Sequence, residues 1–232
     1  MQLHLGECLD FEAEPLLLTL VNRPSSNLLI CGYNDAIHDG LLASILKSLY
    51  SQNNIDEIIY FNGRSVVPEG VSKYLNGFRN RLASKYESVP SLNLSEISGE
   101  LERSKRIVII DGLDSTKEFQ SGPASFRPVI KKDEPPSPQE SLKKILEDGP
   151  QQGTFVIAFA ENWKRCNSSC KDLLGFFEMR IGFCMNEDDA GSFVSGTIGK
   201  FKGLEMDNRA VFADRLRNEV SWFRPYVKGE KL

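Results

Sequence analysis

The chain has 232 residues, of which 41% are hydrophobic and 26% are charged, as in ordinary globular proteins with one large α/β domain or two small ones. The formal net charge of −4 argues against a surface devoted to coating nucleic acid, although it leaves room for a local basic stripe. No apolar run approaches the roughly 20 residues that span a bilayer, and no signal-peptide pattern is present, so we expect a cytoplasmic protein without direct membrane contact.

Apolar runs alternate with segments of helical period, which predicts a mostly parallel sheet with crossover helices. In chain order, strands are predicted at 16–20, 28–31, 56–61, 106–111, 154–160 and 179–185. Helices are predicted at 37–51, 71–86, 94–103, 139–147 and 187–195, with a helix end at 171–177 and a terminal hairpin at 209–213 and 219–223. Residues 115–138 are rich in Pro, Gly and Ser and predict a flexible loop. Without a repeat or a second core, we expect a single domain over 1–232.

The most informative segment is 28–40, which has the pattern of a phosphate-binding loop without its chemistry. A short apolar run ends at Gly32, irregular residues follow, and a helical pattern comes next. A working loop reads G-x-x-x-x-G-K-[ST], in which glycines bare backbone N–H groups, lysine reaches the phosphates and a hydroxyl binds magnesium. In this chain the second glycine is replaced by Ile37, the lysine by His38 and the hydroxyl by Asp39.

The order of strand, loop, helix, hydrophobic strand ending in Asp, and strand with a polar tip resembles that of RecA-like P-loop motors. More closely, the chain resembles the degenerate terminal ATPase modules of large FtsK/SpoIIIE-type DNA-pumping ATPases. The segments that carry this resemblance, in order and spacing, are 5–7, 26–32, 41–49, 135–138, 146–153, 177–181, 188–189, 208–212 and 222–226. The resemblance implies a RecA-like P-loop NTPase fold of α/β class, with a mostly parallel central sheet, helices on both faces and a C-terminal β-hairpin.

The resemblance also implies vestigial roles for residues at the ends of two strands. Asp111 matches the magnesium-side aspartate, and Gly112 replaces the glutamate that activates water. Asp114 is near but out of register. Glu161 follows Ala160 at a strand tip where active relatives carry a Thr-Gln pair that senses the γ-phosphate. The vestigial phosphate loop consists of Gly32, Tyr33, Asn34, His38 and Asp39.

These replacements predict a module without catalytic residues of its own. Asp39 adds negative charge where phosphates and magnesium would lie, and His38 is mostly neutral near its ordinary pKa of about 6.5. Losing one preorganised donor typically raises a barrier by about 2.7–4 kcal/mol, and several roles are missing here together. We therefore expect no bound cofactor, with ATP and Mg²⁺ possible only if the degenerate loop still binds them.

The predicted function is that of a structural or regulatory ring module in a larger DNA- or protein-translocating motor. Its partners would be other ATPase modules of the same polypeptide or ring, with DNA or a protein substrate reached through a parent that could be membrane-associated. Such parents act in cell division and chromosome segregation. One alternative is a divergent active DNA translocase in which Asp111 acts with Asp114 or Glu161. Another is a protein-binding module that uses the vacated pocket, as in type VII secretion ATPases.

Other charged positions have a structural and a functional interpretation. Arg180 aligns with an arginine common in the family and is an inter-subunit candidate, or it forms a salt bridge to Asp188 or Asp189. The basic residues of the helix predicted at 71–86 could contact DNA or form a solvated face; they are Lys73, Arg79, Arg81 and Lys85. No metal site is expected, because the five cysteines lack nearby histidine partners and are interpreted as free thiols.

Overall fold

The computed structural model describes residues 1–10, 12–52, 54–64, 94–101, 105–120, 136–194, 201, 204–206 and 208–227, together with the backbone of 86–89. The helix predicted at 71–86 therefore lies outside the described residues, apart from Tyr86, which begins a strand instead. The basic residues predicted on that helix lie outside as well. Of the predicted loop 115–138, residues 121–135 lie outside the described part, and residues 117–119 form a short 3-10 helix.

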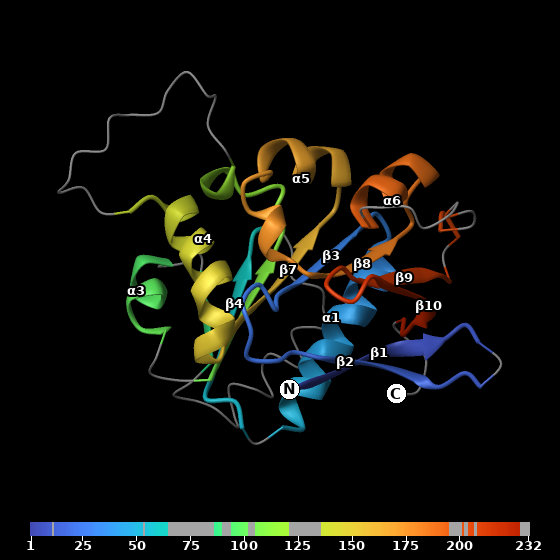
Figure 1. The fold of residues 1–232 in the computed structure, drawn as a ribbon, viewed down its shortest axis with the longest axis horizontal. Helices are drawn as coiled ribbons and strands as arrows, with labels where there is room; N and C mark the ends of the chain where they lie inside the picture. Colours follow the sequence, from blue (N-terminus) through green and yellow to red (C-terminus); the bar gives the residue numbers. More distant parts are fainter. Residues whose placement is uncertain are drawn as a thin grey trace.

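The described residues form one ten-stranded sheet in the order β2-β1-β10-β9-β8-β3-β7-β6-β4-β5 (Figure 1). The strands are β1 (Gln2–Cys8), β2 (Pro15–Thr19), β3 (Leu28–Gly32), β4 (Glu57–Asn62), β5 (Tyr86–Val89), β6 (Arg106–Asp111), β7 (Thr154–Ala160), β8 (Met179–Phe183), β9 (Ala210–Asp214) and β10 (Glu219–Pro225). From β8 to β5 all pairs are parallel, and from β8 to β2 all are antiparallel. The predicted α/β fold with a parallel central sheet and a terminal hairpin (β9–β10) is confirmed.

Helices cover both faces of this sheet, as the family resemblance implies (Figure 1). They are α1 (Asp35–Tyr50), α3 (Leu94–Gly99), α4 (Pro138–Asp148), α5 (Trp163–Ser169) and α6 (Glu187–Val194), with 3-10 turns η2 (Lys117–Phe119), η3 (Gly149–Gln152) and η4 (Leu174–Phe176). Apolar residues of α1 join one core cluster, and those of α3, α4, α5 and α6 join the other. The predicted helix end at 171–177 is only the turn η4, and α5 was not predicted.

The central strands are buried on both faces, which explains why their sequences are continuous apolar runs. In β6 and β7 every residue is buried. Alternate residues of these strands enter opposite core clusters: Ile107 faces α1, whereas Val108 faces the α3–α4 side. The buried runs of β6 and β7 match the predicted strands 106–111 and 154–160 residue for residue.

Helix α1 makes close polar and steric contacts with the antiparallel part of the sheet. The Ser44 hydroxyl donates to the carbonyl of His4 over 2.6 Å, and the Ser48 hydroxyl accepts from the His4 amide over 3.0 Å. Strand β10 pairs only with the second half of β1. The two serine side chains bind the backbone of the first half, which β10 does not reach. At Gly40 a Cβ atom would lie 1.9 Å from the carbonyl oxygen of Tyr226, so only glycine fits there.

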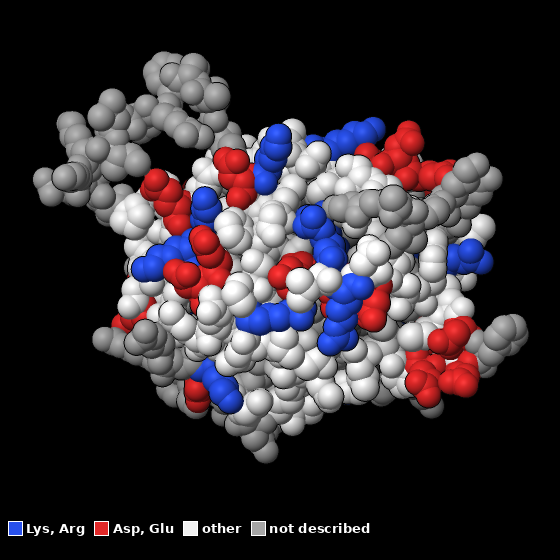
Figure 2. Space-filling view, viewed as in Figure 1, with Lys and Arg blue, Asp and Glu red and all other residues white. Residues whose placement is uncertain are grey.

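The surface shown in Figure 2 carries Lys and Arg side chains interspersed with Asp and Glu, without a continuous basic area on this face among the described residues. Within that described part, no helix has the length and apolar character needed to cross a membrane.

Candidate functional site

The start of α1 lies at the carboxyl end of β3, where a phosphate loop would lie. Helix α1 begins at Asp35, so only Tyr33 and Asn34 separate it from Gly32. The Asn34 side chain caps the helix by accepting hydrogen bonds from the amides of Ala36 and Ile37 over 2.9 and 3.1 Å. The irregular segment is therefore shorter than predicted, because α1 begins two residues before the predicted start at 37. The residues at its lysine and hydroxyl positions belong to the first turns of a helix whose end amides are already bonded.

His38 projects from this first turn into a buried ionic network. Its Nε2 lies 3.0 Å from Oδ1 of Asp111, and its Nδ1 lies 3.1 Å from Oδ1 of Asp39. The ring also packs edge-to-face on Phe159 of β7 with the centroids 4.7 Å apart. His38 is only 5% exposed, so it is a buried residue of the helix and not a loop residue open to solvent.

The guanidinium of Arg64 completes the network from the turn after β4. It donates to His38 Nδ1 over 3.0 Å, to Asp35 over 2.6 Å and, through Nε, to Glu161 over 3.2 Å. One ring nitrogen cannot accept from Arg64 and donate to Asp39 at the same time, so these contacts describe two alternative protonation states of His38. Burial lowers the pKa of His38, but its hydrogen bonds to Asp111 and Asp39 outweigh burial and raise the pKa above the ordinary value.

Asp111 lies at the end of β6 and is fully buried. Besides His38, it accepts a hydrogen bond from the hydroxyl of Tyr60 over 2.8 Å. The next residue, Gly112, has φ +95°, a conformation that L side chains rarely adopt. A glutamate at this position would be strained, which gives the glycine a structural reason.

Asp114 is also fully buried, and it is bonded to the next loop along the sheet edge. Its carboxylate accepts from the backbone amides of Glu161 and Asn162 over 3.2 and 3.0 Å, and from Arg165 over 2.8 and 2.9 Å. Asp114 therefore joins the turn after β6 to the start of α5.

A cavity of about 240 Å³ remains at the mouth of this network, lined by Gly32, Tyr33, Asp35, His38, Arg64 and Glu161. Tyr33 is 61% exposed, and its hydroxyl accepts a hydrogen bond from the Asn162 side chain. The cavity thus has an exposed aromatic rim, while Arg64 lies between the carboxylates of Asp35 and Glu161.

Solved structures share this architecture over nearly the whole chain. ATPases 2 and 3 of EssC from Geobacillus thermodenitrificans match 100% of this chain at 16% identity and a TM-score of 0.63. ATPases 2 and 3 of Thermomonospora curvata EccC, solved with a signal sequence peptide, match 99% at 13% identity and 0.58. The pCW3 conjugation coupling protein TcpA, solved with ATPγS, matches 97% at 10% identity and 0.61. The fold is that of the FtsK/SpoIIIE-type P-loop ATPases.

The chain spans 46%, 41% and 66% of these three solved chains, respectively. No family model matches the sequence, and no curated protein matches it.

Most of the predicted site residues lie close together at one edge of the sheet. Gly32, His38, Asp111 and Glu161 lie there, as the carboxyl ends of neighbouring parallel strands should. Gly32 also has a packing reason, because a Cβ atom would lie 2.1 Å from the carbonyl oxygen of Phe183 on β8. Packing alone therefore explains a glycine at this position, without a role in binding phosphate.

Arg180 does not lie at this edge of the sheet. It is 4% exposed and donates to the carbonyls of Leu174 and Phe193, with its guanidinium 5.5 Å from the Trp163 and Phe193 rings. Neither the expected inter-subunit contact nor the expected salt bridge to Asp188 or Asp189 fits this placement. Burial lowers the pKa of Arg180 to about 10.

Sequence reasoning missed Arg64, Tyr60 and Arg165, although they hold the network together. Arg64 follows the turn signal Asn62-Gly63 after a predicted strand, and the pairing of Asn62 with Asp111 brings it to the site. The parallel order of the strands could have placed Arg64 at the site, because the carboxyl ends of parallel strands meet at one edge of the sheet. Within the described residues the cysteines are free, and no group of three or more His, Cys, Asp or Glu could hold a metal ion.

Proposed function

We propose that the chain is a catalytically degenerate ATPase module that serves a structural or regulatory role in a larger translocating motor. One observation carries the proposal: a helix start capped by Asn34 and a network of His38, Arg64 and Asp111 stand where a triphosphate would be bound. The amides that would face phosphate are bonded to Asn34, and the nearest cation is bonded to carboxylates. The module would belong to the cytoplasmic part of that motor.

The environment of Asp114 speaks against the rival view of a divergent but active ATPase. A rebuilt mechanism needs a second carboxylate to orient water, and Asp114 was the candidate. Its oxygens are bonded to two backbone amides and Arg165, with no exposed surface. Glu161 is more exposed, but its two carboxylate oxygens are ion-paired with Arg64 over 3.2 Å and with Arg165 over 3.6 Å. Neither carboxylate is placed to act as a base.

The decisive experiment measures ATP binding by calorimetry and Mg²⁺-dependent ATP hydrolysis with the purified chain. We expect no saturable heat at millimolar ATP and no turnover above buffer. Asp111→Asn is the matched control, because it keeps the shape of the side chain and removes its charge. Turnover that this substitution abolishes would overturn the proposal.

A second candidate function is protein binding through the vacated pocket, and the exposed Tyr33 at the rim of the 240 Å³ cavity favours it. The solved EccC structure contains a signal sequence peptide, which makes a peptide ligand a concrete alternative here. Purified modules of the parent motor would be tested for binding to the wild-type chain and to Tyr33→Ala. We expect at least about tenfold weaker binding by the variant, since aromatic anchors often contribute 2 kcal/mol or more. Equal binding would exclude the rim as the contact.

A further inference from the structure

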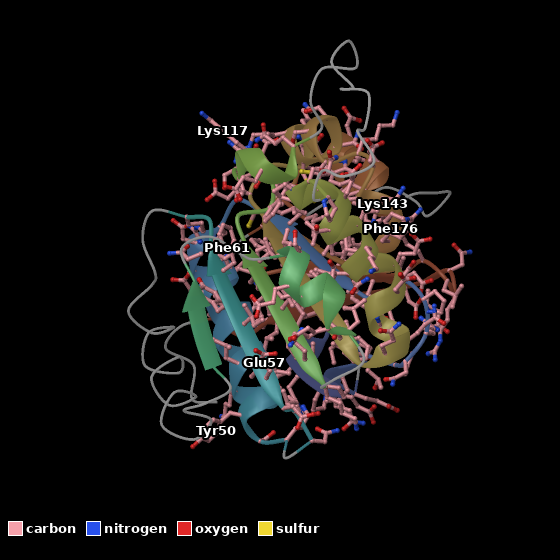
Figure 3. All side chains as sticks on the ribbon, turned by 90° about the vertical axis from the view of Figure 1, so that its left-hand side faces the viewer. Tyr50, Glu57, Phe61, Lys117, Lys143 and Phe176 are labelled. Atoms are coloured by element: carbon pink, nitrogen blue, oxygen red, sulfur yellow. The ribbon has the colours of Figure 1, made fainter. Side chains whose placement is uncertain are left out.

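In the described part of the chain, the sheet ends at two edge strands, β2 and β5. Figure 3 shows the β5 edge beside β4, whose two ends are marked by Glu57 and Phe61. The β2 edge lies at the opposite end of the sheet (Figure 1). An edge strand presents backbone N–H and C=O groups that can pair with another chain. The outer side of β2 is therefore a candidate interaction surface.

The hydrogen bonds between β1 and β2 show which backbone groups of β2 face outward. The Leu20 amide donates to the Met1 carbonyl over 2.9 Å, and the Met1 amino group donates to the Leu20 carbonyl over 3.1 Å. Positions bonded in this way alternate along an antiparallel strand with positions whose groups point away from the partner strand. The amides and carbonyls of Leu17 and Thr19 therefore face outward, where no described strand pairs with them.

The side chains of β2 give this edge little protection against pairing. Natural edge strands are commonly protected by charged side chains, above all by Lys. Strand β2 carries no charge, since Pro15–Thr19 consists of one Pro, three Leu and one Thr. Leu16 and Leu18 face the core, whereas Leu17 is 46% exposed and Val21, just beyond the strand, is 39% exposed. Apolar surface thus lies next to outward-facing backbone groups.

Strand β2 is complementary to itself when two copies pair in antiparallel orientation. With Leu17 opposite Thr19 of a second copy, the two residues exchange both backbone hydrogen bonds, and the two-fold axis repeats the pair. Every outward amide and carbonyl of these two residues is then bonded. With Leu17 opposite itself, the Thr19 carbonyl would instead face Pro15, which has no N–H group. The backbone pattern therefore favours one register, which also keeps the buried leucines of both copies on the same face.

The charges at the two ends of β2 favour the same antiparallel orientation. Glu12 and Glu14 precede the strand, and Figure 2 shows acidic side chains grouped where the β1–β2 hairpin ends. Arg23 follows the strand, and 27% of its side chain stays exposed beside its ion pair with Glu178. Antiparallel pairing places each acidic end near the basic end of the other copy, whereas parallel pairing would bring the acidic ends together.

We propose that β2 is a self-association edge, to which a second copy of this chain adds its own β2 in antiparallel orientation. Backbone hydrogen bonds of Leu17 and Thr19 join the two sheets, and the exposed Leu17 side chains add apolar contact. This edge lies away from Asp111 and needs no nucleotide. Its failure and the failure of the proposed function are therefore separate results.

Two measurements on the purified chain test the proposal. Sedimentation equilibrium from low to high micromolar concentration should show the mass rising to twice that of one chain. Hydrogen exchange of the ¹⁵N-labelled chain should show the amides of Leu17 and Thr19 becoming protected as the dimer forms, while the Leu18 amide, which faces β1, stays protected throughout.

Three outcomes of these measurements would overturn the proposal. One is a single-chain mass at every concentration. Another is a dimer in which the amides of Leu17 and Thr19 still exchange freely, since a different surface would then form the contact. The third is protection of these two amides only after another module of the parent motor is added, which would assign the edge to a different chain.

Leu17→Lys is the decisive variant, because its exposed side chain can change without disturbing the core. It adds the residue that natural edge strands use against pairing and brings two like charges into diagonal positions across the interface. We expect self-association to weaken at least about tenfold while the amide spectrum stays folded. Leu216→Lys is the matched control, at a leucine that is 58% exposed in the turn between β9 and β10, and it should leave association unchanged. Equal association of Leu17→Lys and the wild type, or equal losses in both variants, would refute the edge contact.

Discussion

Buried polar groups are hydrogen-bonded at one end of strands β6 and β7, whereas some of their atoms lack partners among the described residues at the other end. At the carboxyl end, Asp111 and Asp114 are fully buried and each has several hydrogen-bond partners. At the amino end, Arg106 and Thr154 each bury an atom without a partner in the described part of the chain. The buried carboxylates at the carboxyl end are thus satisfied by the protein's own groups, whereas two buried atoms at the amino end are not satisfied by any described residue. A position at the carboxyl edge of the sheet therefore does not by itself leave a carboxylate free to bind a ligand.

The largest effect should follow from removing Asp114. Asp114→Ala leaves two backbone amides and Arg165 without their acceptor, and we expect a loss of unfolding free energy on the order of 3 kcal/mol. Urea denaturation monitored by tryptophan fluorescence gives this value. Glu147→Ala, at an exposed position of α4, is the control and should change stability by less than about 0.5 kcal/mol. A loss for Asp114→Ala no larger than that of the control would show that the carboxyl edge is not held by this residue.

A smaller, pH-dependent effect is expected at Asp111. Because the folded-state pKa of His38 is raised, its stabilising contribution is fully present below the unfolded value of about 6.5 and is lost as pH rises through the folded pKa. Asp111→Asn removes the charge that favours the imidazolium, so we expect a loss of about 1–2 kcal/mol at pH 6 and less at pH 8. Urea midpoints of both proteins at the two pH values test this. An equal loss at both would mean that His38 does not titrate against Asp111.

The smallest change is expected at the amino end and has the opposite sign. Thr154→Val removes a buried hydroxyl without a hydrogen bond and adds a methyl group suited to a strand, so we expect a gain of about 0.5–1 kcal/mol. Thr116→Val, which loses a made hydrogen bond, should instead lose about 1 kcal/mol. Thermal unfolding of the two variants compares them directly. A clear loss for Thr154→Val would indicate that the hydroxyl is already bonded, for instance to buried water.

The central strands could be predicted because burial on both faces leaves a strong local pattern. The four aliphatic residues before Asp111 and the apolar run 154–160 gave the bounds of β6 and β7. The start of α1 was misplaced because the segment was compared with a phosphate loop, although Asn34 is itself a good helix cap. Strand β1 has a weaker pattern because buried and exposed residues alternate in it, and helix α5 has only 7 residues in which to show a period.

The candidate site was predicted only in part, because its partners come from different strands. His38, Asp111 and Glu161 could be placed at one edge from the parallel order of strands alone. That Arg64 inserts between Asp35 and Glu161, or that Arg180 is bonded to carbonyls and packed near aromatic rings, depends on side-chain geometry that no local pattern records. The unbonded atoms of Arg106 and Thr154 are likewise visible only once the register is known.

Because Gly40 has no side chain, helix α1 can contact the backbone that follows β10 directly. With the backbone of Tyr226 resting directly on α1, this helix cannot slide along its axis without pushing the segment that leaves β10. The serine contacts to β1 add a second attachment on the same helix. A pull on the chain near residue 226 would therefore strain the capped turn at Asn34, because Gly40 lies less than two helical turns from that cap.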